Sequence, residues 1–145
     1  MKPSRRRSRE LALQGLYQWL YTGANAAEVL KNLSELDTFK SADREFLEEE
    51  LRGVIDAAHE LRPRIEPFVD RKWKDISPIE RAILLMGAWE LGHRPDIPYR
   101  VTINEAIELG KRFGGTDGHK YVNGVLDRLA AAARPDEVAE KRRNA

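Results

Sequence analysis

The stretch Ser77-Pro-Ile-Glu-Arg-Ala-Ile-Leu-Leu-Met-Gly-Ala-Trp-Glu-Leu-Gly92 carries helix signals at both of its ends. A serine directly before a proline, with a glutamate three residues after the serine, predicts an N-terminal cap at Ser77 that Glu80 completes. Gly92 predicts the stop, because glycine readily adopts the left-handed turn that ends many helices. Pro95 then prevents the helix from continuing.

Apolar residues cover nearly the whole circumference of this predicted helix rather than one stripe. A helix of that kind is typical of the interior of a bundle. Its apolar run is about ten residues long and includes charged residues, whereas a membrane span needs roughly twenty apolar residues. We therefore expect a core helix that performs no chemistry and no membrane association.

Helical spacing of apolar residues continues on both sides of this stretch. It predicts helices from Ser4 to about Thr22, from Asn25 through Leu33, from after Ser41 through Leu61, from Thr102 to Phe113, and from Asp117 into the alanines at 130–133. No stretch alternates convincingly with a period of two, so a sheet is not expected. The predicted class is all-α, with six to seven helices.

The expected boundaries follow from capping and breaking residues. Gly23 predicts a stop, Pro63 and Pro67 predict a break or bend, and Asp117 predicts an N-cap. Thr102 together with Glu105 predicts a capping box at the start of its helix. The charged tail from about residue 134 is expected to be loosely ordered.

The length of 145 residues fits one domain, which we expect to span 1–145. The chain has no cysteine, which rules out disulfides and thiolate metal sites and fits a reducing cytoplasm. No uninterrupted apolar segment follows the basic N-terminus, so we expect neither a signal peptide nor a membrane anchor.

Residues that would indicate catalysis are sparse. His59, His93 and His119 lie far apart in sequence and none has the spacing of a zinc-binding helix. The glycine-rich segment 114–120 lacks the Gly-Lys-Ser/Thr ending of a phosphate-binding loop and is better interpreted as a helix stop followed by a helix start. We therefore expect no enzyme activity, no metal and no cofactor.

The net charge is only +1 and says little about function. The distribution of charged residues along the chain indicates a binding function more clearly. The basic residues Lys2, Arg5, Arg6, Arg7 and Arg9 all precede the first acidic residue. Four arginines at a helix start oppose the helix dipole, and a polyanion would relieve that repulsion. Arginine matches phosphates and stacks on bases, and Gln14, Gln18, Tyr17 and Tyr21 add amide and aromatic groups. From this pattern alone, a solvated N-terminus and an RNA contact are equally good interpretations.

Three blocks in the right order resemble the NusB family of bacterial transcription antitermination factors. They are Arg-Arg-Arg-Ser-Arg-Glu with Gln14-Gly-Leu-Tyr-Gln-Trp19; Ile79-Glu-Arg-Ala-Ile-Leu through Trp89-Glu-Leu; and Pro98-Tyr-Arg-Val-Thr-Ile-Asn-Glu-Ala-Ile-Glu-Leu-Gly-Lys-Arg-Phe113 with His119-Lys-Tyr-Val-Asn-Gly-Val-Leu-Asp127. The resemblance spans nearly the whole chain. It implies two small helical bundles packed together.

The resemblance also implies a function without catalysis. NusB-family proteins bind the boxA element of nascent ribosomal RNA as a heterodimer with NusE, a small-subunit ribosomal protein. The pair joins other Nus factors on RNA polymerase to suppress premature termination. Some members of the family pair with themselves, so a homodimer of the free protein is a further expectation.

Carried over by position, the resemblance implies two sets of site residues. The RNA-binding set is Lys2, Arg5, Arg6, Arg7, Arg9, Gln14, Asp117, Lys120 and Tyr121. The set for the protein partner is Tyr17 and Glu80. Two of these residues have a second interpretation, because Tyr121 also suits core packing and Glu80 also suits the capping box.

The chain departs from the common family pattern at three positions. Gly118 stands where serine is frequent, Tyr121 where phenylalanine is frequent, and Leu85 where a basic residue often occurs. Two alternative functions remain open. One is a protein-interaction module whose arginines only solubilise it, and the other is the RNA-binding domain of a ribosomal RNA methyltransferase.

Overall fold

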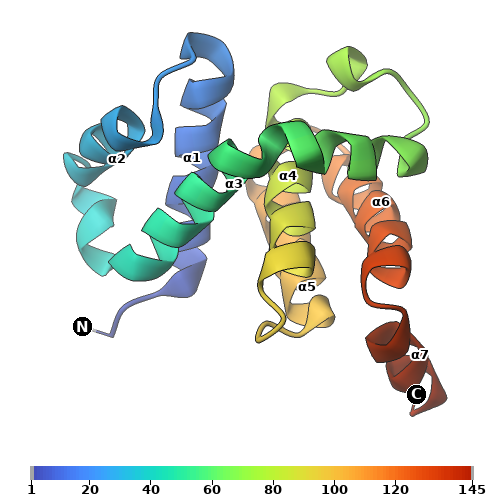
Figure 1. Ribbon diagram of the computed structural model, residues 1–145. Helices are drawn as coiled ribbons and strands as arrows, with labels where there is room; N and C mark the ends of the chain where they lie inside the picture. The colour runs from blue at the N-terminus through green and yellow to red at the C-terminus, as the bar shows by residue number, and fades with distance from the viewer. Residues whose placement is uncertain (1, 145) are drawn as a thin grey trace. The chain divides into compact units, whose positions relative to one another are not determined.

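The computed structural model describes residues 2–144, and helices account for most of them (Figure 1). The elements are α1 (Arg5–Thr22), α2 (Ala26–Ser34), η1 (Asp37–Ser41), α3 (Arg44–Ile65), η2 (Glu66–Phe68), η3 (Trp73–Asp75), α4 (Pro78–His93), α5 (Tyr99–Phe113), α6 (Gly118–Ala133) and α7 (Pro135–Arg143), where η denotes a 3₁₀ helix. Within residues 2–144 no strand forms, and a lone bridge joins Ser4 to Ala42. The all-α prediction is confirmed.

The chain divides into two compact units, Met1–Ala58 and His59–Ala145. Both units are helical, as the two-bundle expectation requires. The boundary falls inside α3, so this helix contributes to both units. No helix formed by residues 2–144 has the length and apolarity needed to cross a membrane.

In the first unit, α1 and α2 pack closely against each other and against the start of α3. Gly15 allows this approach, because a Cβ atom there would lie 2.8 Å from Cγ1 of Val29 and 3.2 Å from Cδ1 of Leu51. The predicted stop at Gly23 is confirmed by its left-handed φ of 68°. The predicted cap of α2 is also confirmed, since Oδ1 of Asn25 accepts from the backbone N–H of Glu28 at 2.9 Å.

The predicted break at Pro63 is wrong. Helix α3 continues through Pro63 to Ile65, and η2 then begins beside Pro67. Pro63 removes one backbone donor in the last turn of the helix. Leu61 and Ile65 are fully buried on either side of it, and burial of two such side chains outweighs one lost hydrogen bond.

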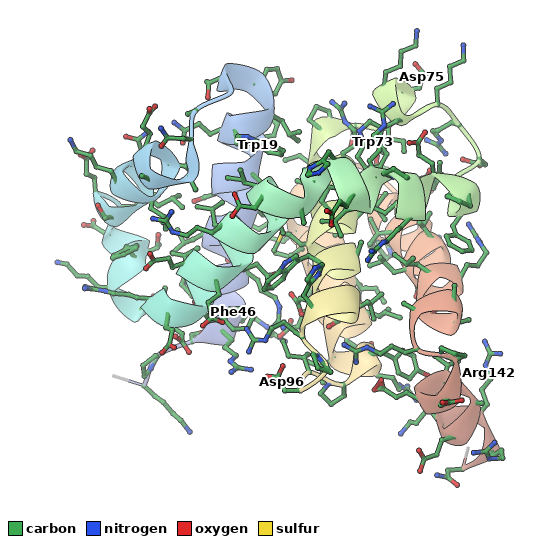
Figure 2. All side chains as sticks on the ribbon, viewed as in Figure 1. Trp19, Phe46, Trp73, Asp75, Asp96 and Arg142 are labelled. Carbon is green, nitrogen blue, oxygen red and sulfur yellow. The ribbon has the colours of Figure 1, made fainter. Side chains whose placement is uncertain are left out.

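In the second unit, α4 is the central helix, and α5 and α6 lie alongside it (Figure 1). Every residue from Ala82 to Leu91 is buried, which confirms the predicted core helix. Its N-terminal cap is also confirmed, because Oγ of Ser77 accepts from the N–H of Glu80 at 3.2 Å. Trp73, in η3, is buried in the same unit (Figure 2).

The predicted ends of three elements need correction. Helix α4 continues past Gly92 to His93, and Gly23 is the only glycine of residues 2–144 with a left-handed φ. Helix α5 begins at Tyr99 rather than at Thr102, whose side chain is buried instead of capping. Asp117 does precede α6, but with a left-handed φ of 65° and no capping hydrogen bond from its side chain.

The tail also differs from its expectation, because residues from Pro135 form helix α7. Arg134, just before α7, donates from its guanidinium to the carbonyl oxygens of Glu90, Leu91, Arg94 and Ile97. Val138 of α7 is buried. These contacts order the start of the tail. They also provide hydrogen-bond donors for the carbonyl groups at the end of α4, where Gly92 was expected to stop the helix.

Candidate nucleic-acid and partner interface

The basic residues at the N-terminus occupy the start of α1 and the segment before it. Ser4 caps the helix, since its Oγ accepts from the backbone N–H of Arg7 at 3.0 Å. The first turn contains no acidic residue, and Lys2, Arg5 and Arg6 are exposed. Exposed guanidinium groups beside the positive end of a helix dipole make an anion-binding surface.

Arg7 and Arg9 are less exposed than Arg5 and Arg6. Nη1 of Arg7 lies 3.4 Å from Oε2 of Glu10, and the Arg7 side chain is 32% exposed. Arg9 is only 4% exposed, so its side chain does not reach the surface. The sequence pattern grouped all the N-terminal arginines, whereas the structure divides them into exposed and packed members.

Phe46, which lies near the start of α3 (Figure 2), contacts two of these arginines. The guanidinium carbon of Arg5 lies 4.8 Å from the centre of the Phe46 ring, and that of Arg9 lies 4.9 Å from it. Cation–π contacts of this kind restrict the arginines without neutralising them. No local sequence pattern joins Phe46 to α1, so the sequence alone did not reveal these contacts.

An exposed aromatic pair lies further along α1. The rings of Tyr17 and Tyr21 are 4.9 Å apart between centres and tilted by 52°. Tyr17 is 39% and Tyr21 66% exposed, and Gln14 is exposed one turn earlier. A hydrogen bond with Tyr21 raises the pKa of Tyr17, so the Tyr17 phenol stays neutral at physiological pH. Large exposed aromatic groups are common at protein interfaces.

The second group of predicted residues lies at the start of α6. Nζ of Lys120 is 3.2 Å from Oδ1 of Asp117, and both residues are exposed. Tyr121 is half-buried, and its hydroxyl is buried beside Asp70, with which it interacts. Burial is the main cause that raises the pKa of Tyr121. The predicted RNA residues at this end therefore combine an exposed ion pair with a partly packed ring.

Arg71, which the sequence did not single out, covers this ring. Its guanidinium carbon lies 4.2 Å from the ring centre of Tyr121, and its Nε donates to Oδ1 of Asp70 at 3.0 Å. The hydrogen bond from Arg71 lowers the pKa of Asp70. The segment before α4 and the first turn of α6 are far apart in sequence, so no local signal could have revealed this contact.

Glu80, a predicted partner residue, lies beside the start of α6, where predicted RNA residues are found. One carboxylate oxygen of Glu80 accepts from Oγ of Ser77 at 2.7 Å. The other, Oε1, would lie 3.3 Å from a Cβ atom at Gly118. Glu80 therefore caps α4 and also lies against Gly118. Gly118 belongs to the first turn of α6, which also contains Lys120 and Tyr121.

The structure thus gathers the predicted residues into two groups, one in each unit. The first unit holds Lys2, Arg5, Arg6, Arg7, Arg9, Gln14 and Tyr17; the second holds Glu80, Asp117, Lys120 and Tyr121. Each group includes both a predicted RNA residue and a predicted partner residue. We name them the α1 group and the α6 group.

Comparison with known proteins identifies relatives along nearly the whole chain. The model of the NusB family matches residues 6–131. The transcription antitermination protein NusB of Paraburkholderia xenovorans is 53% identical over 143 residues, covering 99% of this chain and 99% of that protein. The NusB protein of Dechloromonas aromatica is 52% identical over 141 residues, covering 97% of this chain and 86% of that protein.

Solved structures agree with these relatives. T. maritima NusB superimposes with a TM-score of 0.81 at 31% identity, covering 96% of this chain and 99% of that one. A crystal structure of the antitermination factors NusB and NusE in complex with double-stranded RNA superimposes with a TM-score of 0.80 at 25% identity, covering 88% of this chain and 96% of that one. Sequence and fold therefore lead to the same conclusion: the chain belongs to the NusB family.

Proposed function

We propose that this chain is a transcription antitermination factor that binds boxA RNA of nascent ribosomal RNA transcripts as a heterodimer with the ribosomal protein NusE. The heterodimer helps to assemble the antitermination complex on RNA polymerase. The observation that carries the proposal is the first turn of α1, where exposed Arg5 and Arg6 stand beside a helix N-terminus that contains no acidic residue. Relatives that share about half of the residues have the antitermination role in their names.

In this proposal the α1 group supplies the electrostatic part of RNA binding. Lys2, Arg5 and Arg6 neutralise phosphates, and each neutralised phosphate releases bound counterions. Gln14, on the exposed side of α1, adds an amide that can read a base edge. Arg9 has a positioning role, because its buried guanidinium packs on Phe46 and Arg5 lies over the same ring.

The α6 group supplies a second contact. Lys120 is the exposed cation of this group, and its ion pair with Asp117 has to open or be shared when a phosphate approaches. Exposed ion pairs contribute little stability, about 0–1 kcal/mol, so this rearrangement costs little. A stacked base completes the contact.

For the protein partner, the proposal uses the Tyr17 and Tyr21 pair and Glu80. The aromatic pair offers apolar contact area, whereas Glu80 offers a carboxylate already fixed by Ser77. A complementary basic residue of NusE is the expected counterpart of that carboxylate. The function includes no chemical step and no cofactor, and its place is the cytoplasm, where transcription and ribosomal proteins meet.

The test is fluorescence anisotropy of a short boxA RNA, titrated with the protein alone and with NusE, at two salt concentrations and against a scrambled RNA. The double variant Arg5→Ala with Arg6→Ala should weaken binding and make it less dependent on salt, because fewer counterions are released. The matched control combines Arg142→Ala (Figure 2) with Arg143→Ala, which removes two exposed charges from α7 instead.

Three results separate the proposal from its alternatives. Selective, salt-dependent binding that NusE tightens and the α1 variant loses supports the antitermination role. Equal losses in both double variants would mean that only net charge matters. Binding of NusE without selective binding of RNA in any mixture would favour the protein-interaction module.

A further inference from the structure

Arg71 and Tyr121 form a layered pair at the surface of the second unit. The guanidinium carbon of Arg71 lies 4.2 Å from the centre of the tyrosine ring. At that distance the cation covers one face of the ring. That face is no longer open to another planar group.

The hydroxyl group of Tyr121 is also inaccessible to a ligand. It is buried beside Asp70, with which it interacts. The ring is half-buried, and Lys120 precedes it on the same turn of α6. Tyr121 therefore serves as a support beneath Arg71, and the outermost planar group of the pair is the guanidinium.

Two contacts restrict the Arg71 side chain. One face rests on Tyr121, and Nε donates to Asp70 at 3.0 Å. The side chain nevertheless remains 44% exposed. The second face of the guanidinium and its terminal nitrogens can therefore contact a ligand. Because the side chain is already restricted, it loses less conformational entropy when it binds.

The charges around Arg71 favour a neutral ligand over a phosphate. Asp70 pairs with Arg71, and Asp117 pairs with Lys120. Glu80 adds a further carboxylate near Arg71 and Tyr121, which contributes to the raised pKa of both residues. Asp70 and Glu80 thus offset the charge of the Arg71 guanidinium, and a phosphate would gain little at this side chain. A base is neutral and presents a flat π face to a guanidinium.

We propose that Arg71 is the stacking platform for one unpaired base of the bound RNA, and that Tyr121 and Asp70 position it for this role. The inference rests on the proposed RNA-binding function and adds the residue that contacts the base. It assigns the base contact of the α6 group to Arg71 and a supporting role to Tyr121.

The test compares Arg71→Lys with Arg71→Ala in the heterodimer with NusE, by anisotropy of boxA RNA at several salt concentrations. Lysine keeps the charge but lacks a flat face. Both variants should therefore weaken binding by about tenfold, the size typical of one lost base stack, and both should keep the salt dependence of the unmodified protein. Arg62→Lys is the matched control, because Arg62 also lies over an aromatic ring, that of Trp73, and pairs with a carboxylate, that of Glu66.

A second measurement places the base. RNA carrying the fluorescent base 2-aminopurine at one position after another should show quenching at one unpaired position with the unmodified protein. The quenching should disappear with Arg71→Lys and persist with Arg62→Lys. Thermal unfolding of each variant checks that the fold is retained.

Other outcomes would overturn the inference in distinguishable ways. If Arg71→Lys binds normally while Arg71→Ala loses affinity and salt dependence, Arg71 contacts a phosphate. If both variants bind like the unmodified protein, Arg71 makes no RNA contact, and the proposed function stands without it. If the unmodified heterodimer shows no selective RNA binding, the proposed function fails and this inference fails with it.

Discussion

Thr102 of α5 donates its hydroxyl to Oε1 of Glu90 of α4 across 2.9 Å, and both residues are buried at 2% exposure. This hydrogen bond joins two helices of the second unit. A buried carboxylate needs strong donors, because the loss of its hydration is costly. The Thr102 hydroxyl supplies one of them and so helps to fix α5 against the central helix.

The first prediction concerns this bond. Thr102→Val keeps the shape of the side chain but removes the donor to Glu90, so the free energy of unfolding should fall by about 1–3 kcal/mol. Urea unfolding followed by circular dichroism measures the change. Thr116→Val is the control at an exposed threonine, where the change should stay within about 0.5 kcal/mol. Equal stability of the two variants would show that the buried bond contributes nothing.

The second prediction concerns Arg134. Its guanidinium makes four hydrogen bonds to the carbonyl oxygens at and after the end of α4 and one to Glu137, at distances from 2.6 to 3.1 Å. Lysine cannot reproduce this fork. Arg134→Lys should lower the free energy of unfolding by about 2–3 kcal/mol and expose the segment from Pro135 to proteases.

The control for this variant is Arg142→Lys, at an exposed position of α7 (Figure 2). It should leave both the unfolding midpoint and the rate of proteolysis unchanged. If Arg134→Lys and Arg142→Lys are cleaved at the same rate, the ordering of α7 does not depend on the Arg134 contacts.

The third prediction concerns acid stability. Burial alone would raise the pKa of Glu137, but hydrogen bonds from the backbone N–H of Tyr99 and from Arg134 outweigh it and hold the pKa below its ordinary value of 4.5. A pKa lowered by folding adds stability above the ordinary value, and this stability is lost as the pH falls through the folded pKa. The Glu137 side chain is 37% exposed, so the contribution should be below about 1 kcal/mol.

Glu137→Gln should therefore be slightly less stable than the unmodified protein at pH 7, and the difference should shrink as the pH falls below 4.5. Urea midpoints across this range measure it. Glu140→Gln, at an exposed position on the same helix, should show no such trend. A Glu137→Gln difference that stays constant with pH would contradict the assignment.

The fourth prediction concerns the close approach of α5 to α6. A Cβ atom at Gly110 would lie 2.8 Å from Cα of His119, a backbone atom that cannot move alone. Gly110→Ala should therefore destabilise the protein by about 1–3 kcal/mol, despite the better helix propensity of alanine. It should also weaken RNA binding, because His119 and Lys120 belong to the same turn of α6.

Gly115→Ala is the matched control. No atom lies within 4 Å of a Cβ placed at Gly115, so the free energy of unfolding should change by less than about 0.5 kcal/mol. Anisotropy and urea unfolding should be measured on both variants. Normal stability of Gly110→Ala would mean that the helices separate more easily than the structure indicates.

Much of the local structure follows from residues only a few positions apart. The cap at Ser77, the cap at Asn25 and the stop at Gly23 all form as the sequence predicts, since each depends on contacts within one helical turn. The continuous burial of 82–91 likewise follows from an apolar pattern that leaves no polar face. The class of fold was therefore predictable.

The predicted helix boundaries were wrong where a residue distant in sequence makes the hydrogen bonds at a helix end. Gly92 was expected to end α4, but Arg134 satisfies the carbonyl groups there from 40 or more residues away. Thr102 was expected to cap α5, but its hydroxyl donates to Glu90 instead. The backbone N–H of Tyr99, in the first turn of α5, donates to the carboxylate of Glu137. In each case tertiary contacts offered a better hydrogen bond than the local one.

The sequence by itself determined the helices, the basic start of α1 and the family resemblance, because helical periodicity, charge order and motifs are all properties of neighbouring residues. Only the tertiary structure decided that Arg9 is buried on Phe46 while Arg6 is exposed, and that Arg71 covers Tyr121. Residue types show which contacts are chemically favourable. Which of those contacts form depends on how folding brings distant segments together, since the cost of closing the chain is met only by the packing of the whole unit.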